Sequence, residues 1–183
     1  MYGLIHQAIR DLVVDRFGSE RWLRICLQAK VSNDDFLTFE AYPDPETLSL
    51  VSAASDELNI AQGDLLESFG EYWTTYTAVA GYGHLMDAAG STLEEFVHNL
   101  DRLHAQVRLT FPDLTPPSFR VSELPGGSLE VLYLSEREGL GRLALGVLKG
   151  LVKRFEKPVG VTHQQRDVDG VTRDVFTFER QPG

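Results

Sequence analysis

The sequence contains one cysteine, Cys26, in 183 residues, so no disulfide can form within the chain. Its neighbours are apolar, and we interpret it as a reduced core residue, which favours a cytoplasmic protein. The N-terminal stretch carries acidic residues and no small-residue cleavage site, so it does not resemble a signal peptide. No run approaches the ~20 apolar residues that a membrane span needs.

Basic residues are scarce as well: 17 Lys and Arg against 27 Asp and Glu give a formal net charge of −10. Such a chain repels a nucleic-acid backbone unless its basic residues gather on one face. One short basic cluster, with Lys149, Lys153 and Arg154, has the spacing of the solvated side of an amphipathic helix. We therefore predict neither a nucleic-acid partner nor a membrane partner.

Motifs of common enzyme chemistry are missing too. The chain has no GxSxG, no P-loop and no GxGxxG after a predicted strand. Its 5 histidines form no HxxxH or HExxH pair, which excludes a zinc site built from a local motif. We predict that the chain is not an enzyme.

The pattern of apolar residues changes near the middle of the chain. Up to about residue 112 it has helical periodicity interrupted by Gly and Pro, and beyond residue 117 it alternates as in β-strands. One amphipathic helix is predicted over residues 139–155, and a hairpin around Asp169 and Gly170. The sequence predicts an α+β fold, with a helical N-terminal region packed on a C-terminal antiparallel sheet that carries at least one helix.

A titratable residue, His104, lies inside an apolar stripe of a helix predicted over residues 91–111. Ser91 and Glu94 have the spacing of a capping box at its start. Four apolar residues recur at the three- and four-residue spacing of a buried face: Phe96, Leu100, Leu103 and Val107. His104 is either a core histidine satisfied by a carbonyl or a neutral imidazole that binds a metal or cofactor. As a lone local ligand it fits haem with a proximal histidine.

A second polar constellation follows in the segment YLSER. On a predicted strand, Tyr133, Ser135 and Arg137 alternate and therefore project from one face. A phenol, a hydroxyl and a guanidinium are donors of the kind that hold carboxylates or phosphates. Taken alone, the same residues also fit an ordinary solvated strand face.

Five segments in order, MYGLIHQAI, FGEYW, NLDRLHAQV, PPSF and YLSEREGL, resemble the haem-nitric oxide/oxygen binding (H-NOX) family. This family includes the sensor domain of animal soluble guanylate cyclase and stand-alone bacterial proteins. The resemblance covers essentially the whole chain, and a histidine followed by YxSxR is specific to the family. It implies one domain over residues 1–183, with a helical subdomain over 1–62, a haem-bearing subdomain over 63–183 and haem b buried between helices and sheet.

The resemblance also implies roles for residues of the haem-bearing part. His104 falls on the proximal haem ligand, and Tyr133, Ser135 and Arg137 fall on the clamp of the haem propionates. Pro117 matches the residue that presses on the haem and bends it. The three donors would compensate two carboxylates that otherwise resist burial.

Residues on the other side of the haem are implied in the same way. Ile5 matches an apolar contact from the first helix, and Leu143 matches the position where oxygen-binding members have a tyrosine. Arg142 is the alternative at that position if the helix is aligned one residue differently. Trp73 matches a further distal position, where it is either an apolar wall or an N–H donor.

The implied function is a haem-based sensor of nitric oxide and carbon monoxide that discriminates against oxygen. Nitric oxide would break the iron–histidine bond, and relaxation of the haem would signal to a separate protein, such as a histidine kinase or a cyclic-dinucleotide enzyme. Two alternatives remain: an oxygen-binding or redox-sensing haem protein on the same fold, and a haem-free interaction module in which His104 is only a core residue.

Overall fold

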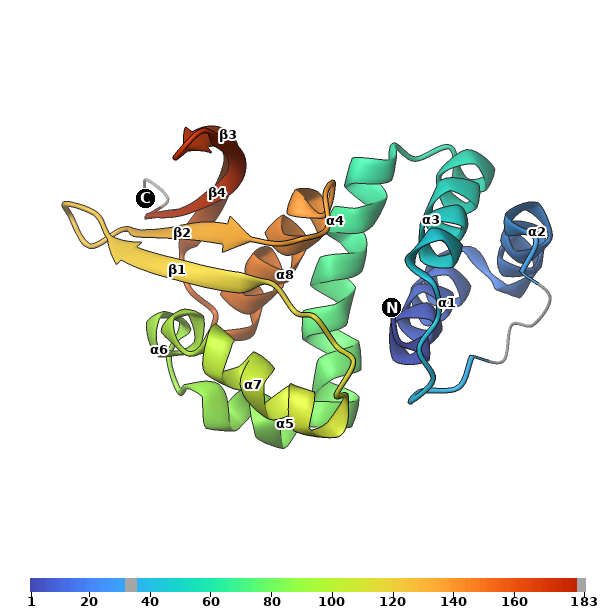
Figure 1. The fold of residues 1–183 in the computed structure, drawn as a ribbon, viewed down its shortest axis with the longest axis horizontal. Helices are drawn as coiled ribbons and strands as arrows, with labels where there is room; N and C mark the ends of the chain where they lie inside the picture. The colour runs from blue at the N-terminus through green and yellow to red at the C-terminus, as the bar shows by residue number, and fades with distance from the viewer. Residues whose placement is uncertain (32–35, 181–183) are drawn as a thin grey trace. The chain divides into compact units, whose positions relative to one another are not determined.

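The computed structural model describes residues 1–31 and 36–180, apart from the side chains of residues 76–80 and 180. The chain divides into two compact units, Met1–Phe69 and Gly70–Gly183. Helices fill the first half, and a sheet with one inserted helix follows (Figure 1). The predicted α+β fold is confirmed. None of the described helices combines the length and apolar character needed to cross a membrane.

The first unit is built from amphipathic helices that share one core. Its helices are α1 (Gly3–Phe17), α2 (Ser19–Ala29), α3 (Asp44–Leu58) and the beginning of α4 (Gln62–Tyr72). Leu12, Ile25 and Leu50 come from three different helices and are at most 2% exposed. The carboxylate of Glu57 on α3 accepts hydrogen bonds from Arg21 and Arg24 on α2, at 2.9 and 2.7 Å. Apolar faces and paired charges thus join α2 to α3.

The second unit also contains helices. They are the π-helix η1 (Trp73–Thr77), α5 (Ala78–Ala89), α6 (Leu93–His98), α7 (Leu100–Thr110) and α8 (Gly141–Arg154), and three of them, α6, α7 and α8, contact its sheet. The single helix predicted over residues 91–111 is wrong, because Asn99 interrupts it. The Asn99 side-chain amide donates to the Ala89 carbonyl at 2.8 Å, and such local bonds compete with helix continuation.

The predicted capping box also lies one residue too early. Thr92, not Ser91, is the N-cap of α6, and its hydroxyl accepts from the Glu95 backbone N–H at 3.2 Å. The Glu95 carboxylate in turn accepts from the Ser91 backbone N–H at 2.9 Å. Ser and Thr stand side by side here, and both can cap a helix, so spacing alone could not choose between them.

Four antiparallel strands form the sheet, in the order β1-β2-β4-β3. Their bounds are β1 (Ser118–Glu123), β2 (Leu129–Leu134), β3 (Val159–Val168) and β4 (Val171–Arg180). The predicted hairpin at Asp169 and Gly170 is confirmed, with φ of 55° and 80° at its two turn residues. Val131 and Phe176 are fully buried in a core that includes Leu148 of α8.

Close backbone contact joins η1 and the end of α4 to α8. A Cβ added to Gly70 would lie 2.3 Å from the Leu143 carbonyl oxygen, so the approach requires glycine. The Thr74 hydroxyl donates to the carbonyls of Gly70 and Val147, at 3.0 and 3.3 Å. These contacts fix the part of α8 that carries Leu143.

Candidate functional site

His104 lies half-buried on α7, and its imidazole has a defined partner. Its Nδ1 is 3.0 Å from the carbonyl oxygen of Pro117. A carbonyl only accepts hydrogen bonds, so Nδ1 carries the proton and Nε2 of the neutral ring keeps its lone pair. The same arrangement fixes the tautomer and orientation of metal-binding histidines.

The protonation state of His104 follows from its surroundings. Burial lowers its pKa below the usual value, whereas the hydrogen bond to Pro117 and the carboxylate of Asp101 act in the opposite direction. Burial dominates, so the imidazole is neutral at neutral pH. A neutral imidazole is the form that binds metals.

Next to His104 the second unit contains a cavity of about 550 Å³, within the usual range of ligand sites. Three of the predicted site residues line it: His104, Pro117 and Ser135. Arg108 and Arg173 add two positive charges to its wall. Tyr133, Arg137, Trp73 and Leu143 belong to the same unit but are not among the residues that line this cavity.

The segment that contains Tyr133, Ser135 and Arg137 differs from the prediction in its secondary structure. Strand β2 ends at Leu134, so Tyr133 alone of the three lies within it. The Ser135 hydroxyl accepts from the Arg137 backbone N–H at 3.0 Å and so closes a short turn instead of continuing the strand. Alternation on one strand face was therefore the wrong reason for grouping these residues.

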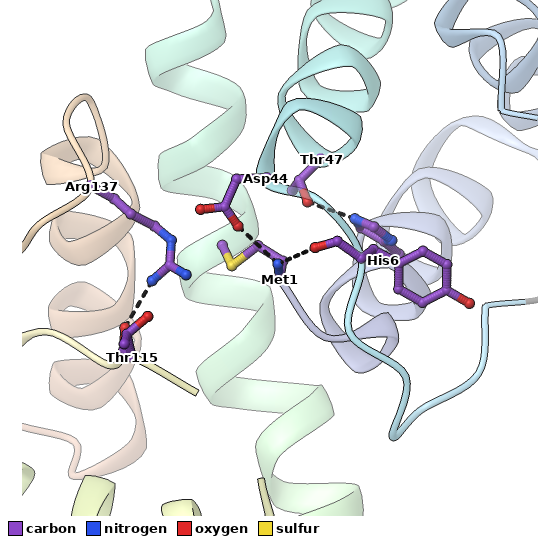
Figure 2. A network of polar contacts seen from close by, with 7 residues as sticks. Met1, His6, Asp44, Thr47, Thr115 and Arg137 are labelled. Carbon is purple, nitrogen blue, oxygen red and sulfur yellow. Dashed lines mark hydrogen bonds and ion pairs between the residues drawn. The ribbon is translucent and has the colours of Figure 1, made fainter. Parts of the chain in front are cut away.

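Other contacts nevertheless bring the three polar groups together. Tyr133 is 6% exposed, and burial raises the pKa of its phenol, opposed by a hydrogen bond with the Ser135 side chain. Arg137 donates from Nη1 to the Thr115 carbonyl at 2.8 Å (Figure 2). This bond holds the turn against the segment that leads to Pro117.

Sequence reasoning missed two residues beside His104. The Phe119 ring lies between the rings of His104 and Tyr133, with centroid distances of 5.8 and 5.6 Å. Asp101 accepts hydrogen bonds from Ser118 and Phe119. A helical spacing of three residues between Asp101 and His104 was the available signal.

The predicted distal residues lie on three elements. Trp73 is half-buried in η1 and packs against the core of the second unit; its role toward a haem stays a prediction. Leu143 is half-buried on α8. Ile5 lies half-buried on α1 in the first unit, and its contact with a haem stays a prediction.

Comparison with known proteins identifies the family to which the chain belongs. The sequence matches the haem-NO-binding family over residues 2–163. The chain belongs to this family. It is 31% identical over 156 residues to the soluble guanylate cyclase gcy-34 of Caenorhabditis elegans, covering 84% of this chain and 23% of the relative. The cyclase gcy-32 is 31% identical over 170 residues, covering 91% and 25%. The chain thus spans about a quarter of these relatives' length.

Solved structures of H-NOX proteins share the fold. An H-NOX protein from S. oneidensis in the Fe(II) ligation state superposes with a TM-score of 0.89 at 21% identity, covering 100% of this chain and 97% of that chain. An unliganded Fe(II) H-NOX protein from K. algicida gives 0.84 at 24% identity, covering 100% and 98%. At these identities the likeness concerns the fold.

Members of this family bind haem. Several features of the second unit are compatible with that cofactor. His104 is a neutral imidazole whose Nδ1 is already occupied by Pro117. Tyr133, Ser135 and Arg137 supply donors suited to carboxylates, and of these three Ser135 also lines the cavity beside His104.

Proposed function

We propose that this chain is a sensor of nitric oxide and carbon monoxide in which His104 is the protein ligand of a ferrous haem. The hydrogen bond from His104 Nδ1 to Pro117 carries the proposal, because it leaves Nε2 available to a metal. Haem b is the proposed form, since covalent attachment through a CxxCH motif needs two cysteines and the chain has one.

The remaining candidate residues would hold and shape the cofactor. Tyr133, Ser135 and Arg137 would donate hydrogen bonds to its propionates, and arginine can do so with two N–H groups. Pro117, which follows two residues after Thr115 in the segment tied to Arg137, would press on the ring. Trp73 would cover its distal side as an apolar wall. The iron, when present, supplies the position at which a diatomic gas binds.

Selectivity would come from the side chain of Leu143. It offers no hydrogen-bond donor, so a partly charged ligand such as dioxygen gains no stabilisation from it, whereas nearly neutral nitric oxide and carbon monoxide need none. Related H-NOX proteins of S. oneidensis have been solved in the Fe(II)NO and Fe(II)CO ligation states. This supports both gases as ligands here.

The output would begin at α7. When nitric oxide binds, His104 would leave the iron, and the helix that carries it would lose one of its attachments. Leu100 is the one buried residue of α7, which favours displacement of the helix. We propose that a separate signalling protein in the cytoplasm, such as a histidine kinase or a cyclic-dinucleotide enzyme, reads this change, and that the chain itself senses without catalysis.

Absorption spectra of the ferrous protein test the proposal. The native chain, His104→Gly and the exposed control His98→Ala are compared alone, in air and with nitric oxide. We expect a haem spectrum and a five-coordinate nitric oxide complex for the native chain and for His98→Ala, and no stable oxygen complex. His104→Gly should lose the iron–histidine signature and regain it when imidazole is added. An unchanged spectrum in His104→Gly would refute the ligand assignment, and a stable oxygen complex would favour an oxygen-binding protein.

A further inference from the structure

Asp101 connects the helix of the proposed ligand to the start of β1. Its Oδ2 accepts from the Ser118 hydroxyl at 2.5 Å and its Oδ1 from the Phe119 backbone N–H at 2.8 Å. The carbonyl oxygen of the residue just before them, Pro117, accepts a hydrogen bond from His104 Nδ1 at 3.0 Å. Asp101 and His104 lie one turn apart on the same face of α7 and together hold three consecutive residues.

The segment held in this way has limited support from the sheet. β1 is an edge strand, so its backbone pairs with β2 on one side only. Pro116 and Pro117 precede it and have no backbone N–H with which to join a ladder. A carboxylate that accepts from both Ser118 and Phe119 fixes this start of the strand, and with it the Pro117 carbonyl.

A carboxylate in the first turn of a helix usually needs no further explanation, because the helix N-terminus attracts negative charge. Attraction to the helix N-terminus does not account for the contacts that Asp101 makes with β1. Both of its oxygens are engaged by a different element, 17 and 18 residues away in the chain. The contact is therefore a connection between α7 and β1, and it is adjacent to the bond that orients the imidazole.

We propose that Asp101 is a positioning residue for His104: by tying α7 to the start of β1, it keeps the Pro117 carbonyl on His104 Nδ1 and so keeps Nε2 directed at the metal. This inference rests on the proposed function, since it assigns Asp101 a role toward the same iron. Residues that orient a metal-binding histidine commonly change metal affinity 10- to 100-fold when they are removed.

Four variants separate positioning from other effects. Asp101→Ala removes both hydrogen bonds, and Ser118→Ala removes one. Asp101→Asn keeps an oxygen for Phe119 and an amide for the Ser118 hydroxyl, so it should rescue the connection. Glu123→Ala is the control, because it removes an exposed carboxylate at the other end of β1.

The measurements are the iron–histidine stretching band of the ferrous protein, the rate of haem loss to an acceptor protein, and hydrogen exchange of the Phe119 amide. In Asp101→Ala we expect a shifted or broadened band, haem loss faster by about 10- to 100-fold, and faster exchange at Phe119. Ser118→Ala should lie between this variant and the native chain, and Asp101→Asn and Glu123→Ala should be close to native.

Two failures can be told apart. If His104→Gly abolishes the stretching band but Asp101→Ala leaves the band and haem loss at native values, even with faster exchange at Phe119, Asp101 is only structural and this inference is overturned. If the native chain has no such band, or keeps it in His104→Gly, the proposed function fails and the role of Asp101 fails with it.

Discussion

Two side chains of opposite character, His104 and Leu143, decide in the proposed function which gases bind. His104 presents a lone pair on Nε2 because burial keeps the ring neutral and its Nδ1–H donates to the Pro117 carbonyl. Leu143 presents only carbon and hydrogen. A polar group introduced at Leu143 should therefore change selectivity without changing the proximal bond.

Leu143→Tyr should create an oxygen-binding protein. A phenol at this position can donate to a partly charged dioxygen, and hydrogen bonds to charged groups contribute about 1.5–3 kcal/mol, or roughly 10- to 150-fold in affinity. Oxygen titration of the ferrous protein by absorption spectroscopy measures the effect. Leu143→Phe is the matched control, with the ring but no hydroxyl. Equal oxygen affinity in both variants would place Leu143 away from the ligand.

His6 in the first unit is buried, and none of the residues that the structure describes pairs with it as an opposite charge. It is 0% exposed, its Nε2 is 2.7 Å from the Thr47 hydroxyl (Figure 2), and the rings of Phe36 and Tyr42 pack edge-on against it. Burial, assisted by the positive charge of the Met1 amino group, lowers the pKa of His6 from 6.5 to about 4. Protonation of His6 therefore opposes folding.

The free energy of unfolding should fall as the pH falls from about 6.5 to about 4. In this window the His6 imidazole is protonated in the unfolded chain but not in the folded chain. The contribution of His6 to the free energy of unfolding is therefore fully present above pH 6.5. It is lost progressively below that pH, by roughly 3 kcal/mol in total. Denaturation followed by tryptophan fluorescence, to which Trp22 of the first unit contributes, measures it. In His6→Gln, which keeps an amide for Thr47, the decline should be shallower. Equal declines in both proteins would contradict the assignment.

At single residues, the sequence patterns predicted which side chains are chemically important better than they predicted the contacts that those side chains make. The YxSxR spacing marked Tyr133, Ser135 and Arg137, and hydrogen bonds do connect them. The bond from His104 to Pro117, 13 residues away, was not predictable, because periodicity describes one element and this contact joins two. Their roles toward haem stay predictions.

Glycine residues allow α8 to lie close to η1 and to the sheet in the second unit, because a side chain at these positions would collide with the neighbouring element. Gly70 meets the backbone of Leu143 and Val147, and Gly150 meets Thr74. Gly141 faces the carboxylate of Asp174. These contacts place α8 against η1 and against the sheet, and no periodicity of apolar residues reports them.

Gly70→Ala should destabilise the protein and disturb the distal side. Its new methyl group would meet the Leu143 carbonyl oxygen at 2.3 Å, and overpacking of this kind typically costs about 1–3 kcal/mol. Gly81→Ala is the control, because a Cβ there meets nothing within 4 Å. Thermal unfolding compares their stabilities, and carbon monoxide affinity of the ferrous protein reports on the distal side. Equal stability of the two variants would show that the contact is loose.

Element types were predictable where one pattern dominated, and element ends were not. The helix over residues 139–155 and the hairpin at Asp169 and Gly170 follow from strong periodicity and turn chemistry. The break at Asn99 depends on a hydrogen bond to the Ala89 carbonyl. It could not be predicted, because the helical pattern of apolar residues continues on both sides of Asn99. The π-helix at Trp73 left no signal in the pattern either.

At the scale of the whole molecule, the candidate residues are distributed unevenly between the two units. Seven of the eight lie in Gly70–Gly183, and Ile5 alone lies in Met1–Phe69. If haem is held as proposed, its binding energy acts mainly on the second unit, because a ligand stabilises the structure to which it binds.

Haem loading should therefore slow amide hydrogen exchange most in the second unit, above all over α7 and residues 115–137. Free ligand at 100 times its dissociation constant stabilises the bound state by about 2.7 kcal/mol. Mass spectrometry of peptides from haem-free and haem-loaded protein measures the change, with His104→Gly as the control, which should show weaker protection. Protection confined to Met1–Phe69 would place the cofactor elsewhere.

The interruption at Asn99 has a consequence for how such a chain can change over evolution. Phe96 and Val97 on α6 anchor the core, whereas the helix that bears His104 begins only after the break. If His104 binds iron as proposed, substitutions in α6 should mainly change the stability of the fold, and substitutions on the exposed face of α7 should mainly change the response to a gas. Under the proposed function, gas sensitivity would vary with the exposed face of α7 while the buried residues of α6 keep the fold stable.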